Sequence, residues 1–147
     1  MEAAAQRDEI VDAARGGKGR GDGDAALDAM LVRRGTGGSR LVARTDFDDH
    51  PRVQYARQYR SDVIVYGDER GLVTIGAGLA GRREMSVEAA DHNRGLGTAL
   101  IAEAIGLVPE GELLFAAVSP GNARSLRAFL SLGFTPIGSE CLIRPAA

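Results

Sequence analysis

The chain is poor in cysteine, tryptophan and long apolar runs, and each deficit excludes a class of protein. It has one cysteine, Cys141, and no tryptophan among its 147 residues. A single cysteine cannot form an internal disulfide, and no histidine stands at metal-ligand spacing from it, so disulfide scaffolds and zinc fingers are excluded. The longest apolar stretches, residues 99–102 and 113–118, are far shorter than the roughly 20 residues of a membrane-spanning helix. We therefore expect no membrane contact.

An excess of basic charge is missing as well. The chain has 18 lysines and arginines against 20 aspartates and glutamates, which gives a formal net charge of −2. Proteins that wrap nucleic acid need a polycationic surface to neutralise phosphates, so we expect no nucleic-acid partner. The acidic, alanine-rich start also lacks the basic and apolar regions of a secretory signal peptide. These features predict a cytoplasmic location.

The length suits one domain preceded by a short flexible segment. Chains of this size bury about two-thirds of their surface on folding, which supports a real core. Residues 2–15 predict at most a marginal helix, and residues 16–24 alternate glycine with charges that cancel. Such a composition cannot bury apolar surface, so it favours a flexible linker. We expect a flexible segment over residues 1–23 and a single domain over residues 24–147.

The first half of the domain gives weak signals for regular structure. A helix is predicted over residues 24–35, with Asp24 as its N-cap and Gly35 at its end. Its apolar face would consist of Leu27, Met30 and Leu31. A short strand is predicted over residues 40–44. A second helix is predicted from Pro51 to Arg60, capped by Asp49 or His50.

The second half predicts alternating strands and helices. Three β-branched runs, separated by glycine-rich turns, predict an antiparallel meander between residues 62 and 89. The sequence then predicts a helix from residue 95, a buried strand at 113–118, a helix that ends at Gly133 and a last strand bent at Gly138. The order βββαβαβ predicts an α+β fold: a mixed, mostly antiparallel sheet with helices on both faces.

The most informative stretch is the strand-to-helix junction after residue 89. There, unpaired backbone N–H groups at the positive end of a helix would converge as a cradle for a diphosphate. The residues that form it are Arg94, Gly95, Leu96, Gly97 and Thr98. A glycine pair that only caps and packs the helix is the alternative. The stretch is neither a P-loop, since no lysine followed by Ser or Thr comes after the glycines, nor a dinucleotide fingerprint, since a third glycine is missing.

Two blocks of this chain resemble the GNAT superfamily of acyl-CoA-dependent N-acetyltransferases. HNRGLG, residues 92–97, is similar to the family's phosphate motif, but His92 stands where the family has Gln or Arg. The family's later helix is matched at Asn122, Ser125, Phe129, Gly133 and Phe134. Phe129 replaces the usual tyrosine, which in much of the family protonates the departing thiolate. The resemblance spans residues 63–143 and implies a GNAT-like fold.

The resemblance implies acetyl-CoA as co-substrate, bound where two neighbouring strands part, and no metal. The pantetheine arm would pair with the backbone of the strand at residues 86–88, as an added pseudo-strand. The implied cofactor-binding residues are Ser86, Val87, His92, Arg94, Gly95, Leu96, Gly97, Thr98, Asn122, Ser125 and Phe129. Helix capping is the alternative role for Asn122 and Ser125.

The chemistry implied is direct attack of an amine on the acyl thioester, which requires a base. Strand alternation places Glu84 and Glu88 on one face, and Glu88 lies nearer the expected thioester. Two solvated glutamates are the alternative. The other candidate bases, which no spacing favours, are His50, Tyr55, Tyr59 and Asp91. Water could protonate the thiolate in place of the missing tyrosine hydroxyl.

Three functions remain open from the sequence. The first is an N-acetyltransferase that moves an acetyl group from acetyl-CoA to a primary amine in a ternary complex. The second is an acyl-CoA-binding sensor without turnover, and the third is a structural domain that binds no CoA. The amine acceptor would be a small molecule or a peptide, and a homodimer is an open alternative to a monomer.

Overall fold

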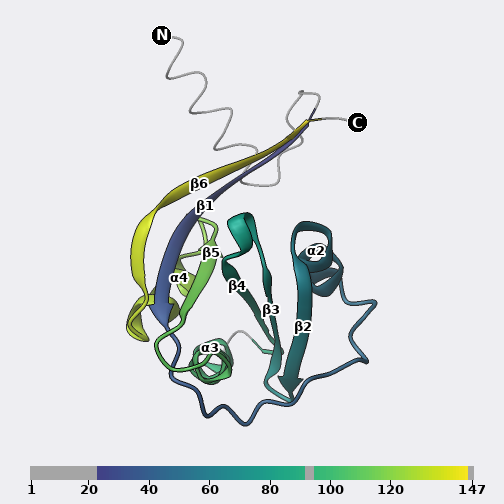
Figure 1. The fold of residues 1–147 in the computed structure, drawn as a ribbon, viewed down its shortest axis with the longest axis vertical. Coiled ribbons are helices and arrows are strands. Elements are labelled where there is room, and N and C mark those ends of the chain that lie inside the picture. Colours follow the sequence, from purple (N-terminus) through teal and green to yellow (C-terminus); the bar gives the residue numbers. More distant parts are fainter. Residues whose placement is uncertain (1–22, 92–94, 146–147) are drawn as a thin grey trace.

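The computed structural model describes residues 23–91 and 95–145. They form one six-stranded sheet with the strand order β2-β3-β4-β5-β1-β6 (Figure 1). The elements are β1 Gly23–Arg34, α2 Pro51–Tyr59, β2 Ser61–Asp68, β3 Gly71–Ala77, the 3₁₀ turn η1 Leu79–Gly81, β4 Arg83–Ala89, α3 Leu96–Leu107, β5 Leu113–Val118, α4 Ala123–Ser131 and β6 Thr135–Pro145. β4 and β5 run parallel, whereas the other neighbouring strands are antiparallel. The predicted α+β class with a mixed sheet is confirmed.

The predicted meander is present as β2, β3 and β4. β2 and β3 form a hairpin, at whose turn Gly71 has φ 142°, a conformation that side chains disfavour. η1 makes the second turn and ends at Gly81, which has φ 74°. β3 and β4 then pair from Gly71 opposite Ala89 to Ala77 opposite Arg83. These glycines explain why the turns were visible in the sequence.

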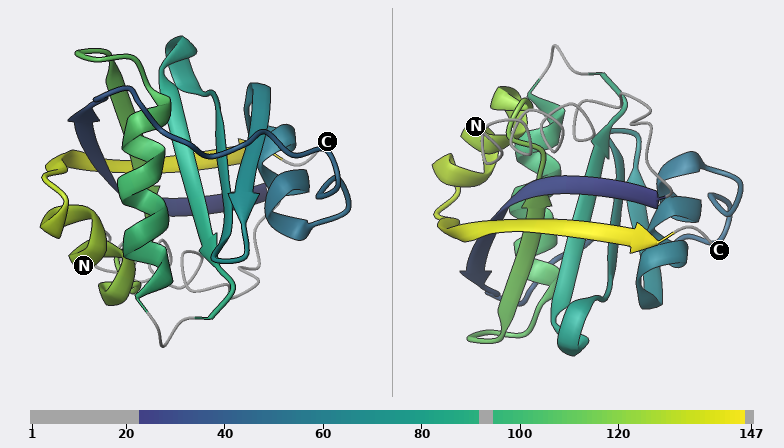
Figure 2. Two further views of the ribbon diagram at one scale, coloured as in Figure 1. Left: turned by 90° about the horizontal axis from the view of Figure 1, so that it is seen from below. Right: turned by 90° about the horizontal axis from the view of Figure 1, so that it is seen from above.

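Helices cover both faces of the sheet, as the sequence predicts. Leu72 and Val73 are neighbours on β3 and therefore point to opposite faces. Leu72 packs against Val53 of α2, whereas Val73 belongs to the main core, to which α3 and α4 contribute. Figure 2 shows α3 lying along the sheet on its own face. The face that carries α2 is called the α2 face below.

The main core lies between the sheet and the pair α3 and α4. From α3 it receives the apolar residues Leu100, Ile101, Ala104 and Ile105, all at most 4% exposed. Phe129 of α4 and Phe134 pack edge to face, with ring centroids 5.0 Å apart and an interplanar angle of 85°. Each fully buried residue of this size contributes about 1.5–3 kcal/mol of transfer free energy. This core fixes the positions at which α3 and α4 begin.

The helix predicted over residues 24–35 is wrong, because this segment is strand β1. β1 lies between β5 and β6 and pairs with both. Leu31 is buried in the main core, while its neighbour Met30 lies near Arg82 on the α2 face, so both faces of the strand are covered. Pairing with two strands that come much later in the chain overrides the local helical spacing.

The predicted linker also extended too far. Gly23 and Asp24 already belong to β1, opposite Pro145 and Arg144 of β6. The rest of the linker and the marginal helix lie outside the described residues. The strand predicted over residues 40–44 is reduced to one isolated bridge, between Ala43 and Tyr66.

Residues 35–50 instead run past the end of α3. The backbone N–H groups of Thr36, Gly37 and Ser39 donate to carbonyls of residues 105, 108 and 106, at 3.1, 2.8 and 3.1 Å. These bonds satisfy carbonyls that the end of a helix leaves without partners. A side chain on Gly35 would meet the Val108 carbonyl oxygen at 2.5 Å, so this close approach requires glycine.

The remaining boundary predictions are confirmed. α2 begins at Pro51, and its N-cap is His50, whose Nδ1 accepts a hydrogen bond from the Arg52 N–H at 3.1 Å. After α4, Gly133 has φ 84°. β6 shifts register against β1 next to Gly138, which has φ 152°, so the predicted bend is there.

The far ends of β1 and β6 form a two-stranded ribbon. β1 pairs with β5 from Ala29 to Arg34 only, whereas its pairing with β6 continues to Gly23. The ribbon therefore projects beyond β5, and it arches over the α2 face (Figure 1). Among the helices in the described part of the chain, none has the length and apolar character needed to cross a membrane.

Candidate functional site

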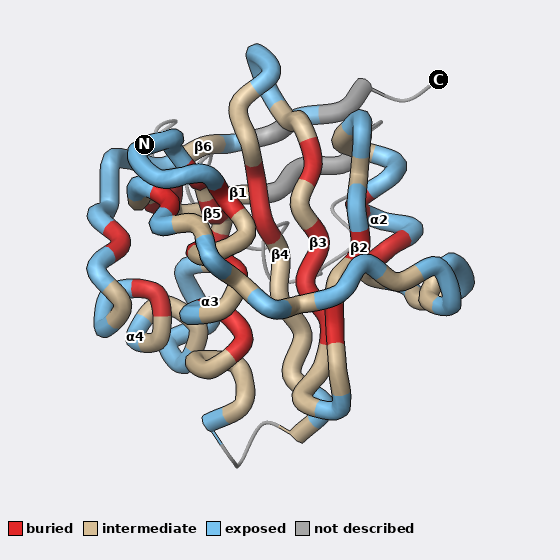
Figure 3. The backbone as a smooth tube through the Cα atoms, turned by 60° about the horizontal axis from the view of Figure 1, so that its bottom comes forward, coloured by how far each residue is buried: buried red, intermediate tan, exposed pale blue. Residues whose placement is uncertain are grey.

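β4 and β5 part from each other after a short parallel contact. They pair at Glu84 with Phe115 and at Met85 with Ala116. β4 remains paired with β3 as far as Ala89, but residues 86–89 have no register partner on β5 within the described chain. Burial follows the same division: Glu84 and Met85 are buried, whereas residues 86–89 are partly exposed (Figure 3). The expected divergence of the two strands is present, and it opens one edge of β4.

Two helices begin beside this open edge. Because β4 and β5 are parallel, their carboxyl ends lie at the same side of the sheet, and α3 and α4 follow them there. Each helix N-terminus carries a partial positive charge. Neither helix has an acidic residue in its first turn to offset that charge. The arrangement suits an anionic ligand.

The predicted glycine cradle lies at the start of α3. Gly95 is the N-cap, with φ 67° and ψ 14°, and no side chain caps the helix. A Cβ placed on Gly95 would have nothing within 4 Å, and one on Gly97 would meet only the Ala89 Cβ, at 3.8 Å. The first backbone N–H groups of α3 are thus bordered by space that no side chain of the described residues fills. The candidates His92 and Arg94 lie outside the described residues.

Asn122 and Ser125 lie together at the start of α4. Asn122 is the N-cap, and its Oδ1 accepts a hydrogen bond from the Ser125 N–H at 3.2 Å. The capping role considered from the sequence is therefore real for Asn122, and its side-chain amide N–H groups remain as donors. Phe129, two turns further on, is 3% exposed and is part of the core.

The face that β4 turns away from α3 carries the two candidate bases. As the alternation predicts, Met85 and Val87 face the main core, whereas Glu84 and Glu88 contact arginines from α2 or its end. Ser86, between the two glutamates, shares a hydrogen bond of 2.5 Å with the buried hydroxyl of Thr74. Glu84 and Glu88 differ in burial and in the arginines that contact them, and this difference affects which of them can accept a proton.

Glu84 is held by two arginines. Arg60 Nε lies 3.0 Å from Oε1 and Arg82 Nε lies 2.7 Å from Oε2. Burial, the largest influence, raises the pKa of Glu84, but the hydrogen bonds from Arg82 and Arg60 outweigh it and lower the pKa below its ordinary value. Both carboxylate oxygens are thus engaged, and the group stays ionised at neutral pH.

The same arginines connect the ribbon to the sheet. Arg82 bridges Glu84 of β4 and Glu140 of β6, the second contact being 2.7 Å. Asp28 of β1 stands opposite Glu140 in the register. Burial, and then the charge of Glu140, raise the pKa of Asp28. These residues form a carboxylate–arginine cluster that holds the ribbon against the α2 face, consisting of Asp28, Arg60, Arg82, Glu84 and Glu140.

Glu88 lies at the other end of this face and is more open, with its side chain 38% exposed. Arg52 Nε contacts Oε2 at 2.8 Å, and His50 Nε2 lies 3.5 Å from Oε1. Because His50 Nδ1 accepts a backbone hydrogen bond, the proton of the neutral ring is on Nε2, the atom that faces Glu88. His50, a candidate base from the sequence, is therefore placed as a partner of Glu88.

The remaining candidates are spread around the fold. Tyr55 and Tyr59 stack on each other on α2, with ring centroids 4.4 Å apart. Asp91 follows the end of β4, and Cys141 is exposed on β6. In residues 23–91 and 95–145, no three His, Cys, Asp or Glu side chains are grouped so that they could hold a metal ion.

The arginine partners were not found from the sequence. Arg52, Arg60 and Arg82 carry no motif, and their spacing to Glu84 or Glu88 has no meaning before α2 is placed against β4. Their places, near the start or end of α2 for Arg52 and Arg60 and just before β4 for Arg82, were the signal that could have suggested them.

The comparisons with known proteins include a distant structural likeness. No family profile matches the chain, and no curated protein matches it. Among solved structures, one from Novosphingobium aromaticivorans, assigned to the GNAT family of acetyltransferases, is similar to this chain with 17% identity and a TM-score of 0.49. The match covers 87% of this chain and 77% of that one. At this level of likeness, activity has to be inferred from this chain's own residues.

Proposed function

We propose that this chain is an acyl-CoA-dependent N-acyltransferase that moves an acetyl group from acetyl-CoA to a primary amine. The observation that carries the proposal is the parting of β4 from β5 beside the start of α3. It brings an open strand edge and a bare helix N-terminus to one place. Those are the two features that a ligand with peptide-like amides and a diphosphate would use.

The residues present fit CoA. The diphosphate would lie against the N–H groups of Gly95, Leu96, Gly97 and Thr98, with His92 and Arg94 as side-chain contacts. The amides of the pantetheine arm would pair with the backbone of residues 86–88, which lack a partner on β5. The Asn122 side chain would approach the arm from α4, and Phe129 lies further along that helix. The thioester, at the opposite end of the arm from the diphosphate, would then lie further back along the open edge of β4, toward Ser86, and Glu88 would reach the amine through water.

The proposed reaction is direct transfer in a ternary complex. An ammonium acceptor loses a proton to Glu88 through a water molecule, and the neutral amine attacks the thioester carbonyl carbon. The C–N bond forms, the C–S bond breaks, and the CoA thiolate takes a proton from water. We assign the base to Glu88, because its side chain is 38% exposed, whereas Glu84 is buried and held by two arginines.

Glu84 and Glu88 do not give the site a preference for positively charged acceptors. A net negative cleft would favour cationic acceptors. Here Arg52 pairs with Glu88, and Arg60 and Arg82 pair with Glu84, so the charges offset each other. We propose an amine on a small molecule or a peptide, without a preference for a second positive charge.

The proposal is tested first by binding. Thermal unfolding of the full chain with CoA should show a rise in stability of about 2.7 kcal/mol when CoA is present at 100 times its dissociation constant. A panel of primary amines with acetyl-CoA should then reveal an acceptor through release of free thiol. No thermal shift at millimolar CoA would refute the proposal and leave the structural-domain alternative.

Glu88→Gln is expected to lower turnover at neutral pH by about 10²-fold or more while CoA affinity stays nearly unchanged. The amide keeps the shape of the side chain but cannot accept the proton. The matched control is Glu112→Gln, which removes an exposed carboxylate paired with Arg83 at 2.6 Å, away from the open edge of β4. Steady-state kinetics measures turnover, and calorimetry measures CoA affinity. Equal turnover in wild type and Glu88→Gln would exclude Glu88 as the base.

An acyl-CoA sensor without turnover is the second candidate, and Phe129 favours it. Position 129 lacks the hydroxyl with which the family protonates the thiolate, and its ring is buried. Tight binding of acetyl-CoA without thiol release for any amine, both in wild type and in Phe129→Tyr, would favour the sensor. The melting temperature of Phe129→Tyr has to be measured alongside, because the added hydroxyl enters the core.

A further inference from the structure

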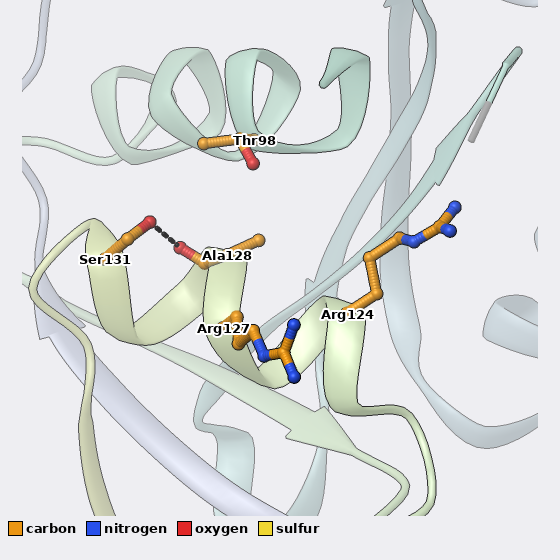
Figure 4. A pocket seen from close by; sticks show the side chains of 5 residues that line it. All are labelled: Thr98, Arg124, Arg127, Ala128 and Ser131. Atoms are coloured by element: carbon orange, nitrogen blue, oxygen red, sulfur yellow. Dashed lines mark hydrogen bonds between the residues drawn. The ribbon is translucent and has the colours of Figure 1, made fainter. Parts of the chain in front are cut away.

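We propose that a pocket between α3 and α4 is a second anion subsite, which takes the 3′-phosphate on the ribose of CoA. This inference rests on the proposed function. The pocket has a volume of about 330 Å³ (Figure 4). Its lining residues are Thr98, Arg124, Arg127, Ala128 and Ser131. Neither arginine was a candidate from the sequence.

One face of α4 builds most of this pocket. Its four lining residues on α4 are spaced i, i+3, i+4 and i+7, so they lie along a single side of the helix. Phe129 points from the other side into the core. Thr98, in the first turn of α3, lines the pocket opposite them (Figure 4). The Ser131 hydroxyl donates to the Ala128 carbonyl at 2.8 Å, so the subsite depends on Thr98 and Arg127 as donors.

The two charged residues among the described lining of the pocket are both arginines. Arg124 is in the first turn of α4, at the positive end of the helix dipole. The start of α3 contributes a second positive end at Thr98. Arginine can bind a phosphate through two parallel N–H bonds, so an anion suits this lining.

The position of the pocket indicates which anion it binds. Thr98 directly follows Gly97, so the pocket adjoins the cradle for the diphosphate. A ligand with a diphosphate on the cradle and a separate phosphate monoester a few atoms away would reach both places. CoA has this arrangement, because its ribose carries the 3′-phosphate beside the diphosphate linkage. Dephospho-CoA lacks that group and is otherwise identical, so the two molecules isolate its contribution.

The test is calorimetric titration of the full chain with CoA and with dephospho-CoA. We expect wild type to bind CoA about tenfold or more tightly than dephospho-CoA, as charge-assisted hydrogen bonds to a phosphate imply. Arg127→Gln should weaken CoA binding about tenfold and leave dephospho-CoA binding unchanged. Arg127 is exposed, so the variant should fold, which its melting temperature will show.

Arg40→Gln is the matched control. It removes the same charge from an exposed position beside Ser39, whose N–H donates to Gly106 near the opposite end of α3. It should leave the ratio of the two affinities as in wild type. If Arg40→Gln reduced the preference for CoA over dephospho-CoA as much as Arg127→Gln does, the effect would be one of general charge, and the subsite would be overturned.

Three further outcomes would overturn the subsite while leaving CoA binding itself intact. In the first, wild type binds CoA and dephospho-CoA with equal affinity. In the second, Arg127→Gln weakens the binding of both ligands equally. In the third, inorganic phosphate stabilises the protein in a way that depends on Arg127, whereas the ratio of the CoA and dephospho-CoA affinities does not depend on Arg127. The last would assign the pocket to free phosphate. If wild type binds neither CoA nor dephospho-CoA, the proposed function fails, and the subsite fails with it.

Discussion

Gly97→Glu is expected to abolish CoA binding while the domain stays folded. A side chain at this position would occupy the space through which a phosphate approaches the N–H groups of α3, and its carboxylate would repel the diphosphate. The Cβ itself meets only the Ala89 Cβ at 3.8 Å, so the fold has room for it. A glutamate in the first turn should even stabilise α3 by about 0.3–1 kcal/mol. Binding and stability should therefore change in opposite directions.

Calorimetry with CoA and thermal unfolding of the same sample measure both effects. We expect a loss of affinity of about 100-fold or more. Gly97→Ala is the control, because it adds the Cβ without the charge and should have a smaller effect. Gly95→Glu should also abolish binding, but its φ of 67° adds a strain of about 1–2 kcal/mol. Unchanged CoA affinity in a folded Gly97→Glu protein would remove the cradle assignment.

Glu84→Gln is expected to destabilise the protein by about 3–5 kcal/mol, because it breaks a buried ion pair and leaves charges without a partner. Glu84 is 6% exposed, and both Arg60 and Arg82 depend on it. Arg82 also holds Glu140, so the substitution should loosen the ribbon from the α2 face. Urea unfolding measures the loss. Glu112→Gln, at an exposed pair, should cost less than about 1 kcal/mol.

The pH dependence of this loss follows from the pKa of Glu84. That pKa is lower in the folded protein than its ordinary value of 4.5. The carboxylate therefore contributes its full stabilisation above about pH 4.5, and the contribution is lost as the pH falls through the lowered folded pKa. Wild type and Glu84→Gln should thus differ most near neutral pH and converge in acid. A constant difference across this range would show that the ion pairs are not its source.

The sequence predicted the elements whose signals are local. Gly71, Gly133 and Gly138 marked turns and bends because their backbone angles disfavour other residues. Pro51 marked the start of α2. The apolar run of β5 marked a strand, but burial on both faces was wrong, because residues 114, 116 and 118 are buried whereas residues 113, 115 and 117 are exposed or partly exposed. The place of the glycine pair at the start of α3 followed from the same kind of signal, since a strand, a glycine pair and a helix are adjacent in the chain.

The sequence could not predict what depends on distant partners. Leu27, Met30 and Leu31 fit a helix face by spacing, yet the segment is a strand because β5 and β6 border it. Similarly, Glu84 and Glu88 appeared alike on one strand face. Only the placement of α2 and the ribbon reveals that one is buried between two arginines and the other is more open. Burial and pairing of charges are tertiary properties.

The position of β1 between β5 and β6 has a consequence for how the protein is made. β1 leaves the ribosome before the other described strands, but both of its partners come much later in the sequence, and Gly23 can meet Pro145 only after residue 145 has been made. The meander of β2, β3 and β4 can pair much earlier, because its contacts are close in sequence. Until β5 and β6 emerge, both edges of β1 lack the partners that they have in the folded domain.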